Sequence, residues 1–233
     1  MIPKIIHHIW LGDNDLPAQF KKFIDDAREL LPDYEFKLWN ESNIDLESPF
    51  VKRNYAAKNW AFVSDYVRFK ILSEEGGIYL DTDMEVLKNF DELLDCSGFA
   101  GLNRQESAIY CGIIGCMKGL PLMTAVLKKY DQLPDGVNPT SPDILTQAYI
   151  EIQESSFLIY PAQAFYPTEE GEKITKQSLI ESYTIHHWGE SWRSYVHLRR
   201  VLRRIGLMGI YHKFTRKKGI LKSNLHIHSG PLA

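Results

Sequence analysis

Apolar and polar residues recur along the chain with two different periods, which predict strands and helices in turn. Apolar side chains that alternate with polar ones, or form short runs, are typical of strands, whereas spacings of three and four are typical of helices. Strands are predicted at 2–10, 35–39, 78–80, 99–102, 109–116, 157–160 and 183–187, and helices at 17–31, 60–75, 121–133 and 142–154. This alternation predicts an α/β protein with a mostly parallel sheet.

The composition is that of an ordinary globular domain that needs no disulfides. The chain has 233 residues, of which 44% are hydrophobic and 24% charged. Three cysteines without paired spacing favour a reducing compartment. The sequence has neither a signal-peptide pattern nor an apolar run long enough to span a membrane, so we expect a cytoplasmic protein that acts at most on a membrane surface.

The charge is distributed unevenly, and this sets the last part of the chain apart. Residues 1–190 hold 17 of the 27 Lys and Arg and all 30 Asp and Glu, a charge of −13, whereas the remaining residues carry +10. So acidic a body argues against nucleic-acid binding. We expect a body at 1–192 and a basic helical tail at 193–233. Its basic and apolar residues suit an anionic membrane surface, and the alternative is a helix packed on the acidic body.

Two aspartates directly follow the predicted strand 78–80 and form the sequence Asp81-Thr82-Asp83. In open α/β sheets ligands bind beyond the carboxyl ends of strands, where both carboxylates can reach one ion. Carboxylate oxygens favour hard cations such as Mg²⁺ or Mn²⁺, which keep positions free for diphosphate oxygens. An isolated D-x-D is usually a solvated turn. The preceding apolar strand and the Gly76-Gly77 helix stop favour a metal site here.

Asp65 and Arg68 lie three residues apart on the predicted helix 60–75 and therefore share a face. One interpretation is a surface ion pair of little consequence. The other places both in the same crevice as the aspartates, with Asp65 bonding sugar hydroxyls and Arg68 contacting a phosphate or carboxylate. The spacing is compatible with either.

Four motifs occur in order: I-P-K-I-I-H-H-I-W, S-D-Y-V-R-F-K-I-L, G-G-I-Y-L-D-T-D and H-H-W-G-E-S-W. Together, over about residues 2–192, they resemble the glycosyltransferases containing the DXD sugar-binding region, also called family 32. This group includes capsular-polysaccharide transferases and Och1-like mannosyltransferases. The resemblance implies a GT-A fold: a nucleotide-binding, Rossmann-like mixed sheet flanked by helices, followed here by the basic tail.

The resemblance also implies roles for individual residues. The nucleotide-sugar donor is expected to contact Trp10, Asp65, Arg68, Tyr79, Asp81, Ser191 and Trp192. Trp10 would stack on the base, and the loop with Ser191 and Trp192 would close over the diphosphate. Asp65, Arg68, Asp81 and Asp83 are the expected catalytic set.

The expected metal ligands are Asp81, Asp83 and a histidine. His186 stands in an H-x-x-G context that matches related enzymes, which makes it the predicted third ligand, with His187 as the alternative. Neighbouring residues of a strand point to opposite faces, so only one of the two reaches the site easily.

The predicted activity is metal-dependent transfer of a hexose or N-acetylhexosamine from a nucleotide sugar to a saccharide or lipid-linked saccharide, and the resemblance implies that the anomeric configuration is retained. UDP is the expected nucleotide, and surface polysaccharide or glycolipid synthesis the expected role. The alternatives are a metal-dependent sugar-nucleotide hydrolase, a nucleotidyltransferase and a non-catalytic nucleotide-sugar or carbohydrate-binding module.

Overall fold

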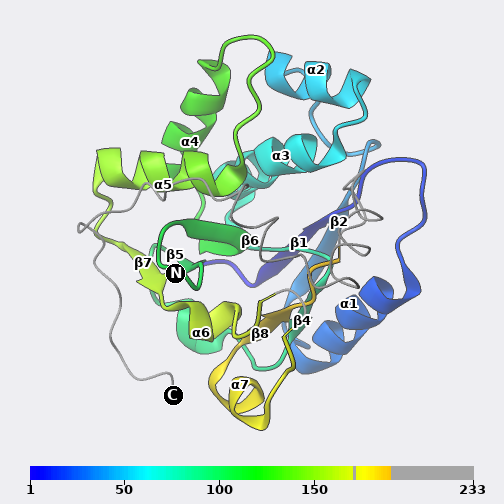
Figure 1. Ribbon diagram of the computed structural model, residues 1–233, viewed down its shortest axis with the longest axis vertical. Helices are drawn as coiled ribbons and strands as arrows, with labels where there is room; N and C mark the ends of the chain where they lie inside the picture. The colour runs from blue at the N-terminus through cyan, green and yellow to red at the C-terminus, as the bar shows by residue number, and fades with distance from the viewer. Residues whose placement is uncertain (170–171, 190–233) are drawn as a thin grey trace, which may run out of the picture.

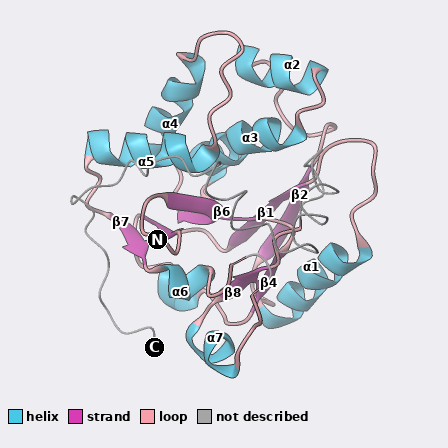
Figure 2. Cartoon of the chain, viewed as in Figure 1, coloured by secondary structure: helices cyan, strands magenta, loops and turns pink. Residues whose placement is uncertain are grey.

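The computed structural model describes residues 1–169 and 172–189, which form a layered α/β domain around one central sheet (Figures 1 and 2). The strands of this sheet lie in the order β2-β1-β3-β6-β5-β7. Their bounds are β1 (Ile5–Ile9), β2 (Glu35–Trp39), β3 (Gly77–Leu80), β5 (Gly98–Leu102), β6 (Ile109–Cys116) and β7 (Phe157–Tyr160).

The sheet is mixed because β6 runs against both of its neighbours. Pairs β1–β2, β1–β3 and β5–β7 are parallel, and β3–β6 and β5–β6 are antiparallel. It follows that β1, β2, β3, β5 and β7 all point the same way and end at one edge. A separate two-stranded ribbon joins β4 (Met84–Val86) to β8 (Thr184–His186) in antiparallel register.

Helices cover both faces of the sheet. In Figure 1, α2 to α5 lie above the sheet, while α1, α6 and the β4–β8 ribbon lie below it. The helices are α1 (Ala18–Leu30), α2 (Pro49–Ala56), α3 (Trp60–Glu75), α4 (Pro121–Asp131), α5 (Ser141–Ile152), α6 (Ala162–Phe165) and α7 (Lys176–Glu181), with a 3₁₀ turn at Asp91–Leu93.

Each covered face has its own hydrophobic core. One core packs α3, α4 and α5 on the sheet through residues such as Val67, Leu122 and Leu145. The other packs α1, β4 and α6 on the opposite face through Leu31, Met84 and Phe165. Because β3 lies between the two cores, all four of its residues are buried, and the turn that follows it is firmly supported.

Gly76 explains how α3 can end directly above β3. It caps the helix with φ +70°, a left-handed conformation that residues with a Cβ rarely adopt. A Cβ there would also lie 2.5 Å from the backbone nitrogen of Lys118. The chain therefore reverses within two residues and enters β3, which carries the D-T-D sequence to the sheet edge.

The predicted fold class, an α/β sheet of GT-A type, is confirmed, and each predicted strand and helix of the body has a counterpart within a few residues. The predictions did not include α2, β4, α6 or α7. The expected basic helical tail at 193–233 lies outside the described residues. Among the described helices, none combines the length and apolarity that a membrane span requires.

Candidate functional site

The D-T-D sequence forms the turn that leads from the central sheet into the β4–β8 ribbon. The backbone nitrogen of Asp81 donates to the Gly112 carbonyl at 2.8 Å, and Met84 closes the turn by donating to the Asp81 carbonyl at 3.1 Å. Thr82 and Asp83 are buried, with 8% of each residue exposed. The turn is therefore an ordered part of the fold.

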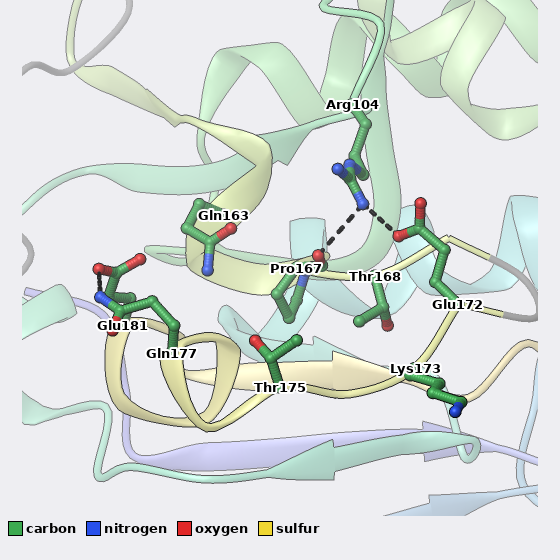
Figure 3. A pocket seen from close by; sticks show the side chains of 9 residues that line it. All are labelled: Arg104, Gln163, Pro167, Thr168, Glu172, Lys173, Thr175, Gln177 and Glu181. Carbon is green, nitrogen blue, oxygen red and sulfur yellow. Dashed lines mark hydrogen bonds and ion pairs between the residues drawn. The ribbon is translucent and has the colours of Figure 1, made fainter.

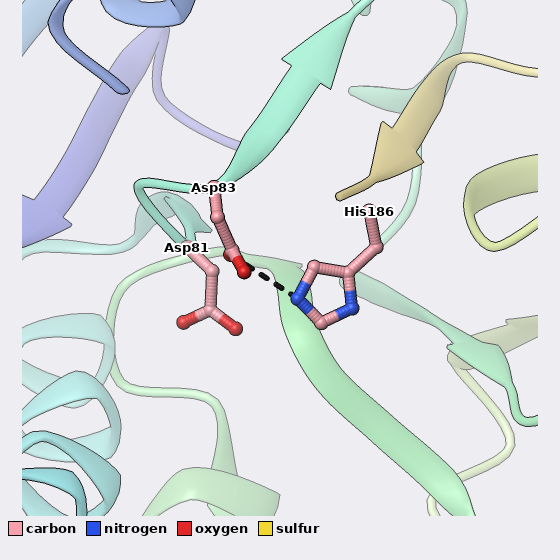
Figure 4. Close-up of side chains that lie close together, drawn as sticks. All are labelled: Asp81, Asp83 and His186. Carbon is pink, nitrogen blue, oxygen red and sulfur yellow. Dashed lines mark hydrogen bonds and ion pairs between the residues drawn. The ribbon is translucent and has the colours of Figure 1, made fainter. Parts of the chain in front are cut away.

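His186 joins the two aspartates from a distant part of the chain. The β4–β8 pairing sets Met84 opposite His186, and the histidine side chain points toward the two carboxylates (Figure 4). One ligand atom from each of Asp81, Asp83 and His186 lies within 4.8 Å of the others. The structure thus brings together the three residues that the sequence analysis assigned to the metal.

Asp83 is held as a carboxylate by the segment that follows β8. Its Oδ1 lies 3.1 Å from His186 Nε2, and its Oδ2 accepts a 2.7 Å hydrogen bond from the Gly189 backbone. Burial raises the pKa of Asp83, but His186 and the Gly189 N–H outweigh burial, so the net pKa is lowered. A side chain at position 189 would displace Phe20, because a Cβ would lie 2.3 Å from Phe20 Cζ.

Asp81 is held from the opposite side by residues of α3 and β3. Tyr79 donates its hydroxyl to Asp81 Oδ1 at 2.6 Å, and Arg68 Nη1 lies 3.6 Å from the same oxygen. Burial raises the pKa of the Asp81 carboxyl; Arg68 opposes this shift and Asp83 adds to it. A cation between the two aspartates would relieve their mutual repulsion.

Arg68 is a buried structural centre of the site, with 6% of the residue exposed. Its guanidinium donates to the Cys111 carbonyl at 2.7 Å, pairs with Asp65 at 2.9 Å and lies over the Tyr79 ring. Burial lowers its pKa, but Tyr79, Asp81 and Asp65 raise it well above its ordinary value. The predicted donor contact of Arg68 stays a prediction; in the structure its nitrogens serve protein acceptors.

Asp65 has more room for a ligand. Its Oδ1 accepts the Ser141 hydroxyl at 2.6 Å, and its Oδ2 accepts the Ser141 backbone N–H at 3.3 Å. With Arg68 these make three protein donors, whereas a carboxylate offers about four acceptor positions. One position is left for a sugar hydroxyl, as the prediction for Asp65 requires. Tyr79, by contrast, is 1% exposed and supports Asp81 from within the protein.

His187, the alternative metal ligand, points away from the two aspartates. Its Nε2 lies 2.7 Å from Glu85 Oε2, and its ring stacks on Phe23 at 4.5 Å between centroids. Only its backbone serves the site, since its N–H donates to the Asp83 carbonyl at 3.0 Å. The structure thus favours His186 over His187.

Trp188 supports His186 and was not singled out by the sequence analysis. The two rings lie 4.1 Å apart between centroids, and Trp188 Nε1 donates to the Thr168 carbonyl at 3.2 Å. Trp188 has φ +54°, an uncommon conformation for a bulky residue that is maintained only where the surroundings fix it. The H-H-W-G sequence was the available signal, but it did not indicate which residue the tryptophan contacts.

Of the remaining residues predicted to contact the donor, the structure describes Trp10 but not Ser191 or Trp192. Trp10 follows β1 at the shared strand edge, donates Nε1 to the Asn14 carbonyl at 2.7 Å and meets Phe20 edge-on. Phe20 in turn adjoins Gly189, so Trp10 lies near the Asp83 side of the site. Ser191 and Trp192 lie outside the described residues.

The residues at this site fit a divalent cation. Two carboxylates and an imidazole suit Mn²⁺ or Mg²⁺, and three protein ligands leave positions for phosphate oxygens. Each carboxylate is also oriented by a further hydrogen bond, Asp81 by Tyr79 and Asp83 by Gly189, as is usual around metal centres. Asp81, Asp83 and His186 would therefore be the ligands.

Comparisons with known proteins find one family model that matches part of this chain, and several relatives that share part of its length. Residues 17–100 match the family described as glycosyltransferase sugar-binding region containing DXD motif. An inositol phosphoceramide mannosyltransferase of Schizosaccharomyces pombe is 31% identical over 54% of this chain and 36% of its own length. An uncharacterized glycosyltransferase of Acanthamoeba polyphaga mimivirus is 28% identical over 55% of both chains. The chain thus spans between about a third and about half of these relatives.

The fold is also that of solved glycosyltransferases. The glycosyltransferase PaToxG superposes with a TM-score of 0.55 and 24% identity, over 65% of this chain and 70% of its own. The family resemblance read from the four motifs is confirmed by the match to residues 17–100, which includes Asp65, Arg68, Asp81 and Asp83. The chain carries the glycosyltransferase sugar-binding region containing the DXD motif, set in a GT-A-type fold.

Proposed function

We propose that this protein is a metal-dependent hexosyltransferase that moves a sugar from a nucleoside diphosphate to a hydroxyl of a saccharide or glycolipid. The observation that carries the proposal is the meeting of Asp81, Asp83 and His186 at the carboxyl end of β3. Ligands of open α/β sheets bind at this edge. The match over residues 17–100 supports the same reaction class.

Each group near the cluster has a task in such a transfer. A divalent ion held by Asp81, Asp83 and His186 would stabilise the charge on the departing diphosphate. Asp65 accepts a hydrogen bond from a donor-sugar hydroxyl at its remaining acceptor position. Arg68 fixes both Asp65 and Asp81, so the sugar and the diphosphate are held in one geometry.

Two described carboxylates near the proposed ligands, Asp65 and Glu85, each have hydrogen-bond partners within the protein, which makes them weaker nucleophiles. Asp65 pairs with Arg68 and Ser141, and Glu85 pairs with His187. We therefore propose front-face transfer with retention, in which the leaving phosphate oxygen takes the proton of the incoming hydroxyl. Trapping of a sugar covalently bound to a protein carboxylate would contradict this version.

The donor is proposed to be a UDP-sugar. The names of the yeast relatives point to mannosyl transfer onto inositol phosphoceramide, which makes a GDP-linked sugar the alternative and a glycolipid a suitable acceptor. Calorimetric titration of UDP- and GDP-sugars, with Mn²⁺ and with EDTA, tests both nucleotides. We expect one of them to bind only with Mn²⁺ and to lose binding in Asp83→Ala. If a nucleotide sugar binds equally well without Mn²⁺ and in Asp83→Ala, the D-T-D turn has only a structural role.

The basic segment 193–233 is proposed to hold the protein on an anionic membrane surface on the cytoplasmic side. Its ten Lys and Arg with no Asp or Glu support this proposal. The full chain is expected to sediment with vesicles containing phosphatidylserine, whereas a chain ending at Ser194 stays in solution. Equal sedimentation of both proteins would favour a tail that packs on the acidic body.

A further inference from the structure

Ser141 holds the Asp65 carboxylate through both its hydroxyl and its backbone N–H. The hydroxyl donates to Asp65 Oδ1 at 2.6 Å, and the N–H donates to Asp65 Oδ2 at 3.3 Å. Ser141 is buried, with 3% of the residue exposed. It is the first residue of α5, whereas Asp65 lies on α3, 76 positions earlier. The two hydrogen bonds together fix how the carboxylate is rotated.

The two oxygens of the Asp65 carboxylate are used unequally. Oδ1 accepts the Ser141 hydroxyl and lies 2.9 Å from Arg68 Nη2, so both of its acceptor positions are filled. Oδ2 accepts one hydrogen bond from the part of the chain that the structure describes, the longer one from the Ser141 N–H. The Asp65 side chain is 14% exposed. The acceptor position that is left for a ligand hydroxyl is therefore on Oδ2.

Helix α5 gives Ser141 a fixed position. Thr140, the N-cap residue, makes no side-chain hydrogen bond to the helix, and the Asp65 carboxylate binds an N–H at the helix start instead. The helix dipole favours a negative charge at this end. One turn further on, Thr146 Oγ1 accepts the Ile109 N–H at 2.9 Å, which anchors α5 to β6.

The loop that leads into α5 is held by α2. Asn138 Oδ1 accepts hydrogen bonds from Asn54 Nδ2 at 3.0 Å and from Arg53 Nη2 at 3.2 Å. Arg53 Nη2 also donates to the Val137 carbonyl at 3.1 Å. Asn54 is 1% exposed, so this contact is part of the protein interior. Because Ser141 follows Asn138 by three positions, these bonds limit where Ser141 can lie.

We propose that Ser141 is a positioning residue that orients Asp65 so that Oδ2 faces a hydroxyl of the donor sugar. This inference rests on the proposed transferase function and deepens it. Without the Ser141 hydroxyl, Oδ1 regains an acceptor position, and the carboxylate torsion of an aspartate is a broad one. The carboxylate then takes up several orientations, and fewer molecules present Oδ2 to the sugar. Binding of the nucleoside diphosphate at the metal cluster does not depend on this orientation.

The test compares nucleotide sugars with the nucleoside diphosphates that lack the sugar. UDP-glucose, UDP-galactose, UDP-N-acetylglucosamine, GDP-mannose, UDP and GDP are titrated with Mn²⁺ into wild type, Ser141→Ala and Ser141→Thr. Thr140→Ala is the matched control, because it removes a neighbouring hydroxyl that donates to Asp143 at 2.9 Å and not to Asp65. Gln163→Ala is a remote control: Gln163 lines a polar cavity of about 240 Å³ whose walls include neither residue of the pair (Figure 3).

We expect Ser141→Ala to raise the Kd for the bound nucleotide sugar about tenfold, because hydrogen bonds to charged groups are among the stronger ones in proteins. The Kd for its nucleoside diphosphate should stay within about twofold of wild type, as should both Kd values in Ser141→Thr and in the two controls.

The difference between the two ligands separates positioning from a general structural role. An unchanged Kd for the nucleotide sugar in Ser141→Ala, or an equal loss of affinity for both ligands, overturns the positioning role. A loss in Ser141→Thr or in Thr140→Ala that matches the loss in Ser141→Ala also overturns it. Wild-type protein that binds neither a nucleotide sugar nor a nucleoside diphosphate overturns the proposed function instead.

Discussion

The two carboxylates of the D-T-D turn are held by two different regions of the molecule. Asp81 follows the central strand β3, and Arg68 and Tyr79, both within 15 positions of it in sequence, contact its carboxylate. Asp83 belongs to the β4–β8 ribbon, where His186 and Gly189 reach it from more than 100 residues away. The side chains that contact Asp81 are close to it in sequence, whereas in the second region the buried His186 Nδ1 has no hydrogen-bond partner among the described residues. The difference indicates that the first region supports the fold and the second completes ion binding.

The largest effect is expected from Arg68→Met, which tests the structural role of the first region. Without the guanidinium, the partly buried Asp65 and Asp81 lose the cation that pairs with both, and breaking a buried pair costs up to about 3–5 kcal/mol. Urea unfolding in EDTA measures the loss. Arg28→Met is the control, because its pair with Asp25 is half exposed and should cost less than about 1 kcal/mol. Equal losses in both variants would remove the distinction between the two regions.

The second region is tested by His186→Gln, with His187→Gln as its neighbour control. Loss of a ligand should weaken Mn²⁺ binding by about 100-fold or more, since changes to groups that merely orient ligands already cost about 10–100-fold. Without metal, unfolding stability should fall by only about 1 kcal/mol, the value of one hydrogen bond. Mn²⁺ electron paramagnetic resonance reports the affinity. If His187→Gln were the variant that lost the ion, the assignment of the two histidines would be reversed.

Lowering the pH from 7 to 5 should reduce the free energy of unfolding, because the buried His8 stays neutral in the fold that holds β3 and Asp81. His8 lies in β1, the strand next to β3, is 2% exposed and has its Nδ1 2.8 Å from the Leu80 carbonyl; burial lowers its pKa from 6.5 to about 4. Between pH 6.5 and about 4, His8 is protonated in the unfolded chain but neutral in the folded chain. The contribution of His8 to the free energy of unfolding is therefore fully present above pH 6.5 and decreases as the pH falls toward 4. At pH 5 the loss attributable to His8 is about 2 kcal/mol. Denaturant unfolding at pH 7 and 5 measures it, and a slope unchanged in His8→Leu would show that other groups carry it.

The smallest effect is expected from Trp188, which positions His186 without being a proposed ligand. Trp188→Ala removes the ring that lies on the imidazole and should weaken Mn²⁺ binding about tenfold. Trp188→Phe keeps a ring, loses the bond to Thr168 and should stay within about threefold of wild type. If Phe were as damaging as Ala, the Thr168 contact would matter more than the ring.

The sequence predicted more about the region around Asp81 than about the region around Asp83. Asp65, Arg68, Asp81 and Asp83 were predictable because one helix, a glycine stop and one buried strand place them within about 20 residues. The burial of Arg68 was not, because the spacing that indicated its pair with Asp65 does not reveal that the Cys111 carbonyl takes another of its nitrogens. The H-x-x-G context indicated His186, but the pairing that delivers it involves only three residues, Met84–Val86, too few to give a periodic signal. The position of Trp188 depends on a contact with the Thr168 carbonyl that joins segments 20 residues apart.

The β4–β8 ribbon also sets the order in which the protein can mature. Asp83 and His186 are separated by 103 positions, so during synthesis the carboxylates emerge from the ribosome long before the imidazole does. The sheet strands up to β7 can pair in the meantime, since all of them precede residue 161. By this sequence of events the nascent chain has no complete ion site until β8 has docked. An ion that needs all three ligands would therefore bind only after the sheet strands and β8 have paired, late in folding.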